Sequence, residues 1–310
     1  MKSTINLVTG GAGFIGSHLI DSLIKSGNKV ICIDNLRNGS LDNIKQWEDH
    51  DDFKFIKHDV RDFFSCEIDN IWHLASIASP KSYLKSPLET INTCFMGTVN
   101  ALELARKYNA KILLASSSEI YGDSKFNILK EEDVGSVNCF SQRASYSEGK
   151  RISETLLFNY KNLFNLDIRV ARIFNTYGPR LSLRDGRVIT SFINSTLNKE
   201  PLTIYGDGNQ TRSFCYINDM VEGLIKLMDS SYDKPLNLGS NHEIKINDLA
   251  NLITSKIYSS PSVEYHKQID GDPISRKPCL KKSKMILGWE PLINLDEGLD
   301  LLINNILRNK

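Results

Sequence analysis

Two patterns of apolar and polar positions alternate through the first half of the chain. Short runs rich in β-branched and other apolar residues recur at 5–10, 29–34, 53–59, 70–76, 111–118 and 168–175. Longer amphipathic segments separate these runs. Strand-like runs that alternate with helical patterns predict right-handed βαβ units and a doubly wound parallel sheet, hence an α/β fold. The runs are almost continuously apolar, which fits strands that are buried on both faces.

The pattern loosens after about residue 178. Loop-rich stretches at 179–187, 205–214 and 270–278 are separated by helix-like segments. We therefore expect a first domain over 1–178 with a returning segment near 212–240, and a smaller C-terminal substrate-binding region that takes most of 179–310. A chain of 310 residues with 41% hydrophobic content can bury the core of one large domain or of two closely associated ones.

Composition narrows the possible functions. The formal net charge of +1 provides no overall field that would attract nucleic acid or a membrane surface. The six cysteines form no C-x-x-C pair and the six histidines have no metal-ligand spacing, so we expect reduced thiols and no metal site. The chain starts with no charged-then-apolar leader pattern and has no apolar run of membrane-spanning length, which predicts a cytoplasmic protein.

A glycine-rich stretch, VTGGAGFIGSHL, follows the first strand-like run and opens a helical pattern. Gly10, Gly13 and Gly16 form G-x-x-G-x-x-G, while Gly11 with the last two forms G-x-G-x-x-G, so spacing alone does not choose between the two fingerprints. Glycines at this place let a pyrophosphate approach the backbone at a helix N-terminus. A turn without a ligand is the alternative, but the strand before and the helix after favour a dinucleotide site.

The ends of the next two strand-like runs carry acidic residues. Asp34 lies at the distance beyond the glycines where a carboxylate accepts hydrogen bonds from an adenosine ribose, and its charge would repel a 2′-phosphate. NAD is therefore favoured over NADP, although Arg37 could offset the repulsion and Asp34 could be a simple turn residue. Asp59 could contact the adenine, cap the following helix, or do both. We place five further residues at the cofactor: Phe14, Ile15, Asn35, Val60 and Leu74.

The pattern Tyr-x-x-x-Lys occurs twice, as Tyr121 with Lys125 and as Tyr146 with Lys150. A Gly-Asp turn follows the first tyrosine directly, whereas the second opens a good helical pattern, and this spacing brings side chains together only on a helix. A phenol titrates near pH 10 in water, and an adjacent ammonium stabilises its phenolate so that it can accept a hydroxyl proton near neutrality. Ser117, at a strand end, could bridge this phenol and a substrate oxygen.

The glycine motif, the serine at a strand end and the Tyr-x-x-x-Lys pair together resemble the short-chain dehydrogenases. The chain is similar, over nearly its whole length, to the extended branch of that family, the NAD-dependent epimerase/dehydratase family. The segments that carry this similarity are EIYGD, RIFNTYGPR, DGNQTRSFCYINDMVEGL and LGWEP. Within that branch the chain most resembles the UDP-glucuronate decarboxylases (UDP-xylose synthases) through LLASSSEIYGD, EGKR, VARIFNTYGPR, DGRV, PLTIYGDGNQTRSFCY and RKP. The resemblance implies a Rossmann domain, NAD as cofactor and a UDP-sugar as substrate.

The serines after the fifth strand-like run take different roles by this resemblance. Ser117 occupies the catalytic hydroxyl position and Glu119 the branch's carboxylate position. Ser118 stands in the sugar pocket where related 4,6-dehydratases carry an aspartate, because expelling water needs an acid as well as a base. We expect Ser116 to pack at the strand end and the ring of Tyr121 to line the cofactor cleft.

The resemblance implies a reaction in three steps. Tyr146 deprotonates the C4 hydroxyl while NAD⁺ oxidises C4, which makes the sugar acid a β-keto acid. Carbon dioxide then leaves because the electrons left at C5 delocalise into the ketone, whose oxyanion Ser117 and Tyr146 stabilise. Reprotonation at C5 and reduction at C4 yield UDP-xylose. Glu119 and Arg212 match positions with roles in decarboxylation and reprotonation. Which of them handles the proton is open. Arg212 could also be a surface arginine that forms an ion pair with a neighbouring carboxylate.

Further positions match the family's substrate contacts. Arg187 and Arg276 would face the diphosphate and ribose, with surface ion pairing as the alternative. Tyr205 and Asn175 match residues near the uracil and pyrophosphate, although a packed loop aromatic and a turn asparagine fit equally well. Gln210 is placed in the same substrate site.

Several positions depart from the decarboxylase pattern and leave the exact sugar open. They are the loop 138–145, Ile77, Cys94 and Cys279. A nucleotide-sugar 4-epimerase or 4,6-dehydratase, a decarboxylase of a 2-acetamido uronic acid, and a non-catalytic NAD-binding protein are the alternatives. By resemblance, apolar stripes on the helical segments 87–107 and 146–163 would form a homodimeric four-helix bundle, unless they are buried within one subunit.

Overall fold

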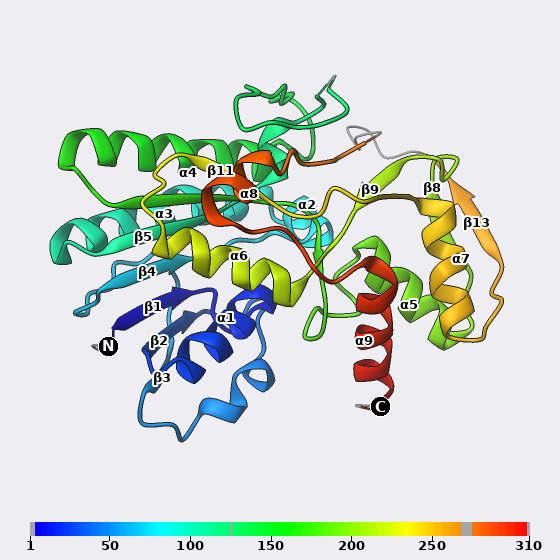
Figure 1. Cartoon of the computed structure of the whole chain (residues 1–310), viewed down its shortest axis with the longest axis horizontal. Coiled ribbons are helices and arrows are strands. Elements are labelled where there is room, and N and C mark those ends of the chain that lie inside the picture. Colours follow the sequence, from blue (N-terminus) through cyan, green and yellow to red (C-terminus); the bar gives the residue numbers. More distant parts are fainter. Residues whose placement is uncertain (1–3, 125, 268–274, 309–310) are drawn as a thin grey trace.

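A computed structural model describes residues 4–124, 126–267 and 275–308 and contains a seven-stranded parallel sheet (Figure 1). The strands lie in the order β11-β6-β5-β4-β1-β2-β3. Their bounds are β1 Ile5–Thr9, β2 Lys29–Asp34, β3 Phe53–Lys57, β4 Asn70–His73, β5 Lys111–Ser117, β6 Ile168–Ile173 and β11 Pro235–Leu238. The chain runs outward from β1 in both directions, so the predicted doubly wound parallel sheet is confirmed.

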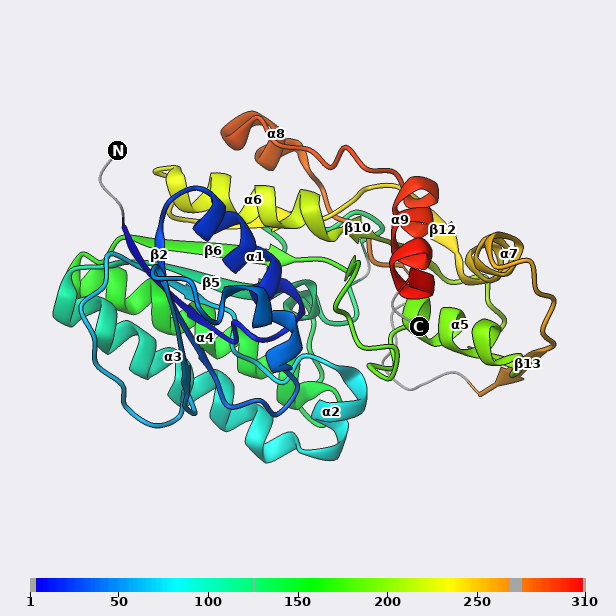
Figure 2. The same cartoon turned by 90° about the horizontal axis from the view of Figure 1, so that it is seen from below.

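Helices cover both faces of this sheet (Figure 2). One layer contains α1 (Phe14–Lys25) and α6 (Ile217–Asp229), which contact each other. The other contains α3 (Pro87–Tyr108) and α4 (Ala144–Phe164), with the short α2 (Pro80–Lys85) packed against α3. Three 3₁₀ turns complete this part: η1 Leu41–Asn43, η2 Lys45–Trp47 and η3 Ser118–Tyr121. The strands are thus buried on both sides, as their continuous apolarity predicts.

A smaller region lies beyond the carboxyl ends of the strands (Figure 1). Its helices are α5 Val188–Asn198, α7 Ile246–Lys256 and α9 Leu295–Arg308. Its strands pair in twos as β8 Leu202–Tyr205 with β13 Val263–His266, β9 Thr211–Ser213 with β12 Glu243–Lys245, and β7 Thr176–Tyr177 with β10 Cys215–Tyr216. The chain returns to the region of the large sheet to form α6 and β11, and returns there again for α8 (Lys281–Leu287), which packs on β11. The boundaries at 178 and 212–240 stay a prediction, and residues 270–274 of the predicted loop lie outside the described residues.

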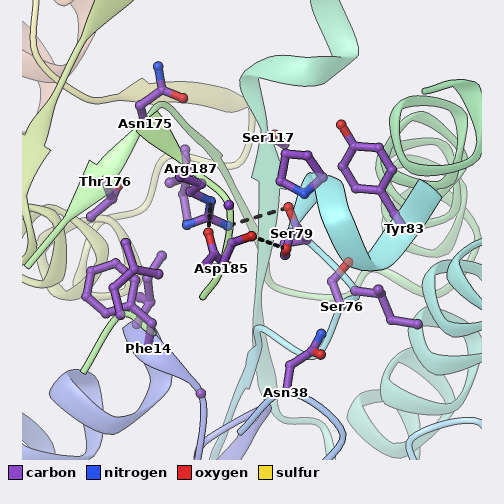
Figure 3. Close-up of a pocket in the computed structure, with 18 of the residues that line it drawn as sticks. Phe14, Asn38, Ser76, Ser79, Tyr83, Ser117, Asn175, Thr176, Asp185 and Arg187 are labelled. Carbon is purple, nitrogen blue, oxygen red and sulfur yellow. Dashed lines mark hydrogen bonds and ion pairs between the residues drawn. The ribbon is translucent and has the colours of Figure 1, made fainter. Parts of the chain in front are cut away.

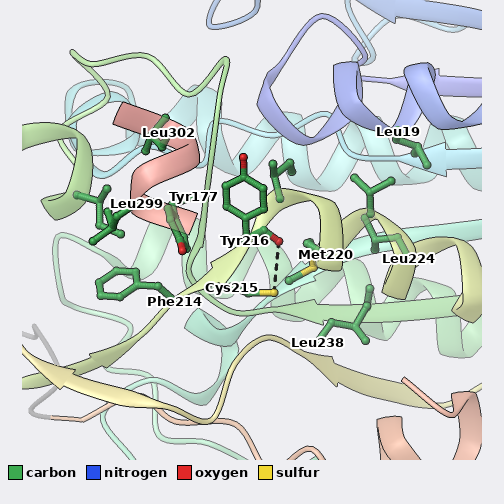
Figure 4. Packing of buried hydrophobic residues seen from close by; sticks show 14 of the residues in the cluster. Leu19, Tyr177, Phe214, Cys215, Tyr216, Met220, Leu224, Leu238, Leu299 and Leu302 are labelled. Atoms are coloured by element: carbon green, nitrogen blue, oxygen red, sulfur yellow. Dashed lines mark hydrogen bonds between the residues drawn. The ribbon is translucent and has the colours of Figure 1, made fainter. Parts of the chain in front are cut away.

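The two regions share one hydrophobic core (Figure 4). Leu19 of α1 and Leu224 of α6 belong to the same buried cluster as Tyr216 and Leu299 of the smaller region. Trp289 is buried in this cluster and donates its indole N–H to the Asp219 carbonyl at 3.0 Å. Continuous packing of this kind fixes the smaller region against the sheet and so fixes the walls of the cleft between them.

Three further findings concern membrane-spanning helices, metal ligands and cysteines. No helix within 4–124, 126–267 and 275–308 is long and apolar enough to cross a membrane. The same residues contain no cluster of histidine, cysteine, aspartate and glutamate that could hold a metal ion. All six cysteines are described and are free thiols.

Candidate active site

A cavity of about 790 Å³ opens at the carboxyl ends of the strands, between the sheet and the smaller region (Figure 3). This is the edge where doubly wound sheets bind their ligands. The residues lining it include every predicted site residue except Asp59. Segments from residue 10 to residue 276 therefore meet at one place.

The glycine loop forms the cofactor end of the cavity. Gly10 has φ +71°, and a Cβ atom there would lie 2.8 Å from the backbone of Ala75. A Cβ on Gly16 would lie 2.3 Å from the Gly10 carbonyl oxygen. Gly13 caps α1 without any side-chain hydrogen bond, which leaves the first backbone N–H groups of the helix available to a pyrophosphate.

The structure separates the two overlapping glycine fingerprints. Gly10, Gly13 and Gly16 line the cavity, whereas Gly11 faces the other way, where a Cβ would lie 2.5 Å from the Cys32 sulfur. The glycine at 11 therefore serves packing against β2, and G-x-x-G-x-x-G is the fingerprint that lines the cavity. The arrangement fits a dinucleotide.

Asp34 ends β2 at the cavity wall. Its two carboxylate oxygens accept hydrogen bonds from the backbone N–H groups of Ala12 at 3.1 Å and Leu36 at 2.8 Å. Burial raises the pKa of Asp34, and these two hydrogen bonds oppose that rise. The carboxylate is thus held rigidly, and each oxygen keeps a lone pair for a ribose hydroxyl.

Arg37 does not offset the charge of Asp34, contrary to one expectation. Its guanidinium forms an ion pair with Glu89 and donates to the Ser86 hydroxyl at 2.8 Å, both at the start of α3. With Arg37 engaged there, Asp34 continues to disfavour a 2′-phosphate. This geometry fits NAD rather than NADP.

Asp59 is not brought to the cavity wall. Its carboxylate accepts hydrogen bonds from the backbone and guanidinium of Arg61, at 2.9 Å each to Oδ1, and from Asn35 at 2.9 Å. The hydrogen bond from the Arg61 side chain holds the pKa of Asp59 below its ordinary value. No helix follows directly, so Asp59 caps a turn rather than a helix, and Asn35 is its link to the cavity. Contact of Asp59 with adenine stays a prediction.

Ser117, Tyr146 and Lys150 meet at the middle of the cavity. Ser117 ends β5 and forms a hydrogen bond with Tyr146, while its Oγ accepts from the Glu119 backbone N–H at 3.2 Å. Tyr146 and Lys150 lie in the first two turns of α4, and the Lys150 ammonium is 5.9 Å from the Tyr146 ring centroid. Lys150 donates to the Ala115 carbonyl at 2.7 Å. The structure thus brings the predicted hydroxyl, phenol and ammonium together.

Burial shifts the pKa of both the phenol and the ammonium. It raises the pKa of Tyr146, opposed by the hydrogen bond with Ser117. Burial also lowers the pKa of Lys150. The ring of Tyr146 stacks in an offset manner on Tyr83 of α2, with centroids 5.3 Å apart and planes 4° from parallel. A buried, stacked phenol has a fixed orientation toward a substrate hydroxyl.

Tyr121 is placed elsewhere. It ends η3, and its ring is fully buried outside the cavity lining, so the prediction that it lines the cofactor cleft is wrong. Its hydroxyl donates to Asn237 at 2.7 Å. Lys125, the lysine of the same Tyr-x-x-x-Lys pattern, lies outside the described residues. Ser116 is buried at the strand end, as expected, and donates to Glu154 at 2.5 Å.

Glu119 lies among three arginines in the cavity. We call this part of the cavity the sugar end, because the resemblance predicts the sugar there. Its Oε1 pairs with Arg276 at 2.5 Å and with Arg143 at 3.0 Å. Burial raises the pKa of Glu119, but the positive charges of Arg276, Arg143 and Arg212 outweigh it and lower the pKa overall. Glu119 is therefore a carboxylate held in place by opposite charges.

Arg143 was not among the predicted site residues. It lies just before α4 in the sequence SQRAS, inside the loop noted only for its departures from the decarboxylase pattern. The available signal was its position three residues before Tyr146, because a helix start next to a catalytic residue also faces the cavity. Its pairing with a distant glutamate could not be inferred from spacing.

The other predicted substrate residues all line the cavity, and their contacts with a substrate stay predictions. Arg276 donates to the Gly122 carbonyl at 3.3 Å besides pairing with Glu119. Arg187 pairs with Asp185 at 3.1 Å beside Ser79 (Figure 3). The remaining five are Ser118, Asn175, Tyr205, Gln210 and Arg212.

The positions that depart from the decarboxylase pattern do not all lie at the sugar. Ile77 packs in a buried cluster with Tyr83 and Tyr146. Cys94 is buried on α3, 3.6 Å from the Ser76 hydroxyl, and Cys279 donates its backbone N–H to the Leu129 carbonyl at 2.7 Å. Two of these positions, Ile77 and Cys94, thus lie beside Tyr146 rather than at the sugar.

The fold and this set of groups define a class: a dinucleotide-dependent enzyme that uses a serine, a tyrosine and a lysine at a hydroxyl or ketone carbon. The model of the NAD dependent epimerase/dehydratase family matches residues 6–239. The chain belongs to this family.

Relatives and solved structures agree on the family and differ in reaction. UDP-glucuronic acid decarboxylase 6 of Arabidopsis thaliana is 47% identical over 96% of this chain and 87% of its own length. UDP-glucuronic acid decarboxylase 1 of Xenopus tropicalis is 45% identical over 96% of this chain and 71% of its own length. The crystal structure of a UDP-glucuronic acid 4-epimerase from Bacillus cereus, in complex with UDP-glucuronic acid and NAD, is 28% identical with a TM-score of 0.88, over 99% of this chain and 100% of that one.

These comparisons confirm several predictions together. The family, the fold and NAD as the cofactor are those expected from the glycine loop, Asp34 and the tyrosine–lysine pair. The names of the relatives also support the predicted nucleotide-sugar decarboxylase and a UDP-sugar substrate.

Proposed function

We propose that this protein is an NAD-dependent decarboxylase that converts UDP-glucuronate to UDP-xylose. The observation that carries the proposal is the carboxylate of Glu119, held by Arg276 and Arg143 in the same cavity as Ser117 and Tyr146. A simple oxidation and reduction at C4 needs no such charged group. The decarboxylases at 45% and 47% identity over most of the chain support the same conclusion.

The reaction begins at the sugar C4 hydroxyl. Tyr146 Oη accepts its proton, and Ser117 Oγ holds the C4 oxygen through a hydrogen bond. NAD, when bound against the glycine loop and Asp34, supplies the reversible oxidation at C4. Lys150 adds a positive charge beside the ring that favours the phenolate.

Carbon dioxide leaves next, from the carbon adjacent to the new ketone. The C5 electron pair then delocalises onto the C4 oxygen, which Tyr146 and Ser117 stabilise by donating hydrogen bonds. Glu119 repels the departing carboxylate. The proton that returns to C5 comes from a solvent water, which Glu119 with Arg276 or Arg212 holds beside that carbon. Of the two, we favour Arg276, because it pairs directly with Glu119 at 2.5 Å.

A 4-epimerase is the second candidate, since a UDP-glucuronic acid 4-epimerase shares the fold at a TM-score of 0.88. Epimerisation would use the same serine, tyrosine and lysine and would conserve the mass of the substrate. The mass of the product therefore distinguishes epimerisation from decarboxylation.

The test is incubation of the purified protein with UDP-glucuronate and NAD⁺, followed by the mass of the nucleotide-sugar product. We expect a product lighter by one carbon dioxide, absent with Tyr146→Phe. A product of unchanged mass with inverted C4 would identify the epimerase, and unchanged UDP-glucuronate would overturn the substrate assignment.

We also propose that the protein is a homodimer. Exposed apolar side chains follow one side of α3 and the neighbouring α4: Leu88, Ile91, Phe95, Ile152 and Phe158. Two copies could bury this surface in a four-helix bundle. Analytical ultracentrifugation of the wild type and of Phe95→Lys tests this, and a wild-type monomer would contradict it.

We further propose that the protein is cytoplasmic. The six free cysteines fit a reducing compartment. Localisation of a tagged full-length protein would test it.

A further inference from the structure

A buried polar network lies directly behind the site and takes no part in the proposed chemistry. Ser116, Arg172 and Asn237 are register partners across β5, β6 and β11, so their side chains project from one face of the sheet. On that face Arg172 Nη2 pairs with Glu154 of α4 at 2.8 Å. Burying a charged pair is unfavourable unless it is fully hydrogen-bonded, and such groups often specify one arrangement rather than add stability.

Tyr121 connects this network to Glu119. Its hydroxyl donates to Asn237 Oδ1 at 2.7 Å and accepts from Arg172 Nη1 at 2.9 Å. Tyr121 is the last residue of η3, a single turn that also carries Glu119. The two hydrogen bonds therefore anchor the end of the turn on which the catalytic carboxylate is mounted.

Asn237 connects the same network to Arg276. Its Nδ2 donates to the Leu129 carbonyl at 3.0 Å. Leu129 is paired through both of its backbone polar groups: its N–H donates to the Lys277 carbonyl at 2.8 Å, and its carbonyl accepts from Cys279 N–H at 2.7 Å. Arg276 immediately precedes this paired stretch.

The contact between Arg276 and Glu119, at 2.5 Å, completes a closed series of contacts that runs through Tyr121, Asn237 and Leu129. We propose that Tyr121 and Asn237 are positioning residues, which set the placement of Glu119 and Arg276 relative to each other. They touch neither end of the pair directly, and they act by holding η3 and the 277–279 segment on the same sheet edge. The catalytic consequence rests on the proposed decarboxylase function, but the positioning itself does not.

The first test is Tyr121→Phe, which removes one hydroxyl and keeps the ring that packs near Phe174. Under single-turnover conditions with UDP-glucuronate, the absorbance of reduced NAD reports oxidation at C4 and trapped carbon dioxide reports decarboxylation. We expect oxidation at the wild-type rate and carbon dioxide release slowed by about 10- to 100-fold, because a misplacement of about 1 Å costs up to about 100-fold. Reduced cofactor should accumulate.

Tyr160→Phe is the matched control. The Tyr160 hydroxyl is also hydrogen-bonded to a side chain, here the Glu103 carboxylate at 2.6 Å, but Tyr160 does not line the cavity. We expect both steps to keep their wild-type rates in this variant. Should Tyr121→Phe fold poorly, Asn237→Ala is the second variant. It removes the hydrogen bond to the Leu129 carbonyl and is also expected to slow the release of carbon dioxide.

Equal slowing of both steps by Tyr121→Phe, or no slowing of either, would overturn the positioning role. A wild type that oxidises C4 without releasing carbon dioxide would instead sink the proposed function. Crystal structures of wild type and Tyr121→Phe then decide the positioning alone: a displaced Glu119–Arg276 contact supports it, and an unchanged contact overturns it.

Discussion

The two ends of the cavity are built in different ways. The cofactor end is one continuous stretch, residues 10–16, completed by Asp34 at the end of the adjacent strand. The sugar end takes Glu119, Arg143 and Arg276 from three segments that are far apart in sequence. A ligand bound mainly through backbone can be recognised from a local motif, whereas a charge cluster arises only where the fold brings side chains together.

Replacement of Tyr146 by phenylalanine should have the largest effect, because this residue serves the step that both candidate reactions share. We expect the turnover rate to fall by about 10²- to 10⁴-fold through loss of the proton acceptor. NAD affinity, measured by calorimetry, should stay close to that of the wild type. Retained turnover would show that another group accepts the C4 proton.

A side chain at Gly16 should damage the cofactor end alone. The Cβ of Gly16→Ala would lie 2.3 Å from the Gly10 carbonyl, so α1 must shift, at about 1 to 3 kcal/mol of unfolding free energy. We expect weaker NAD binding together with a lower denaturant midpoint. Ser22→Ala on the same helix is the control, and wild-type NAD affinity in Gly16→Ala would refute the tight fit.

Asp34→Asn tests cofactor choice. Loss of a charged hydrogen-bond acceptor should weaken NAD binding by about 1.5 to 3 kcal/mol, and removal of the negative charge should improve NADP relative to NAD. The ratio of kcat/KM for the two cofactors is the measurement. An unchanged ratio would mean that Asp34 does not contact the ribose.

The pH dependence tests the sugar end. Glu119 faces Arg143 before α4, Arg212 on β9, Arg276 before the 277–279 segment, and the phenol of Tyr146. Burial raises the pKa of Glu119 and the three arginines lower it further than burial raises it, so the carboxylate loses its charge only as pH falls through that depressed value. Arg143→Gln removes one positive charge and should move the acidic limb of kcat/KM for UDP-glucuronate to higher pH. If the acidic limb stayed at the same pH or moved to lower pH, Glu119 would not be the group that titrates there.

The smallest effect is expected at Arg37. Its pair with Glu89 is partly exposed, so Arg37→Ala should change the free energy of unfolding by about 0 to 1 kcal/mol. The preference for NAD should stay the same, because Arg37 does not neutralise Asp34. A marked change in cofactor preference would show that the guanidinium turns toward the ribose when the cofactor binds.

The choice between the two Tyr-x-x-x-Lys pairs illustrates what local sequence can decide. A tyrosine before Gly-Asp cannot share a helical face with a lysine four residues on, and the structure places Tyr121 at the end of a 3₁₀ turn and Tyr146 in α4. The ring of Tyr121, by contrast, was wrongly expected in the cofactor cleft. Its partners Arg172 and Asn237 lie on strands β6 and β11, and no periodicity reports which side chains meet across strands so distant in the chain.

The sequence by itself determined the parallel α/β sheet, the dinucleotide loop, the preference for NAD and the pairing of Tyr146 with Lys150 on one helix. These follow from periodicity, turn chemistry and spacing within one element, which act over a few residues. Only the tertiary structure decided that Gly11 faces away from the cavity, that Arg37 pairs with Glu89, and that Arg143 and Arg276 converge on Glu119. Such pairings depend on how helices and loops pack across the sheet edge, and packing is a property of the whole fold rather than of any single segment.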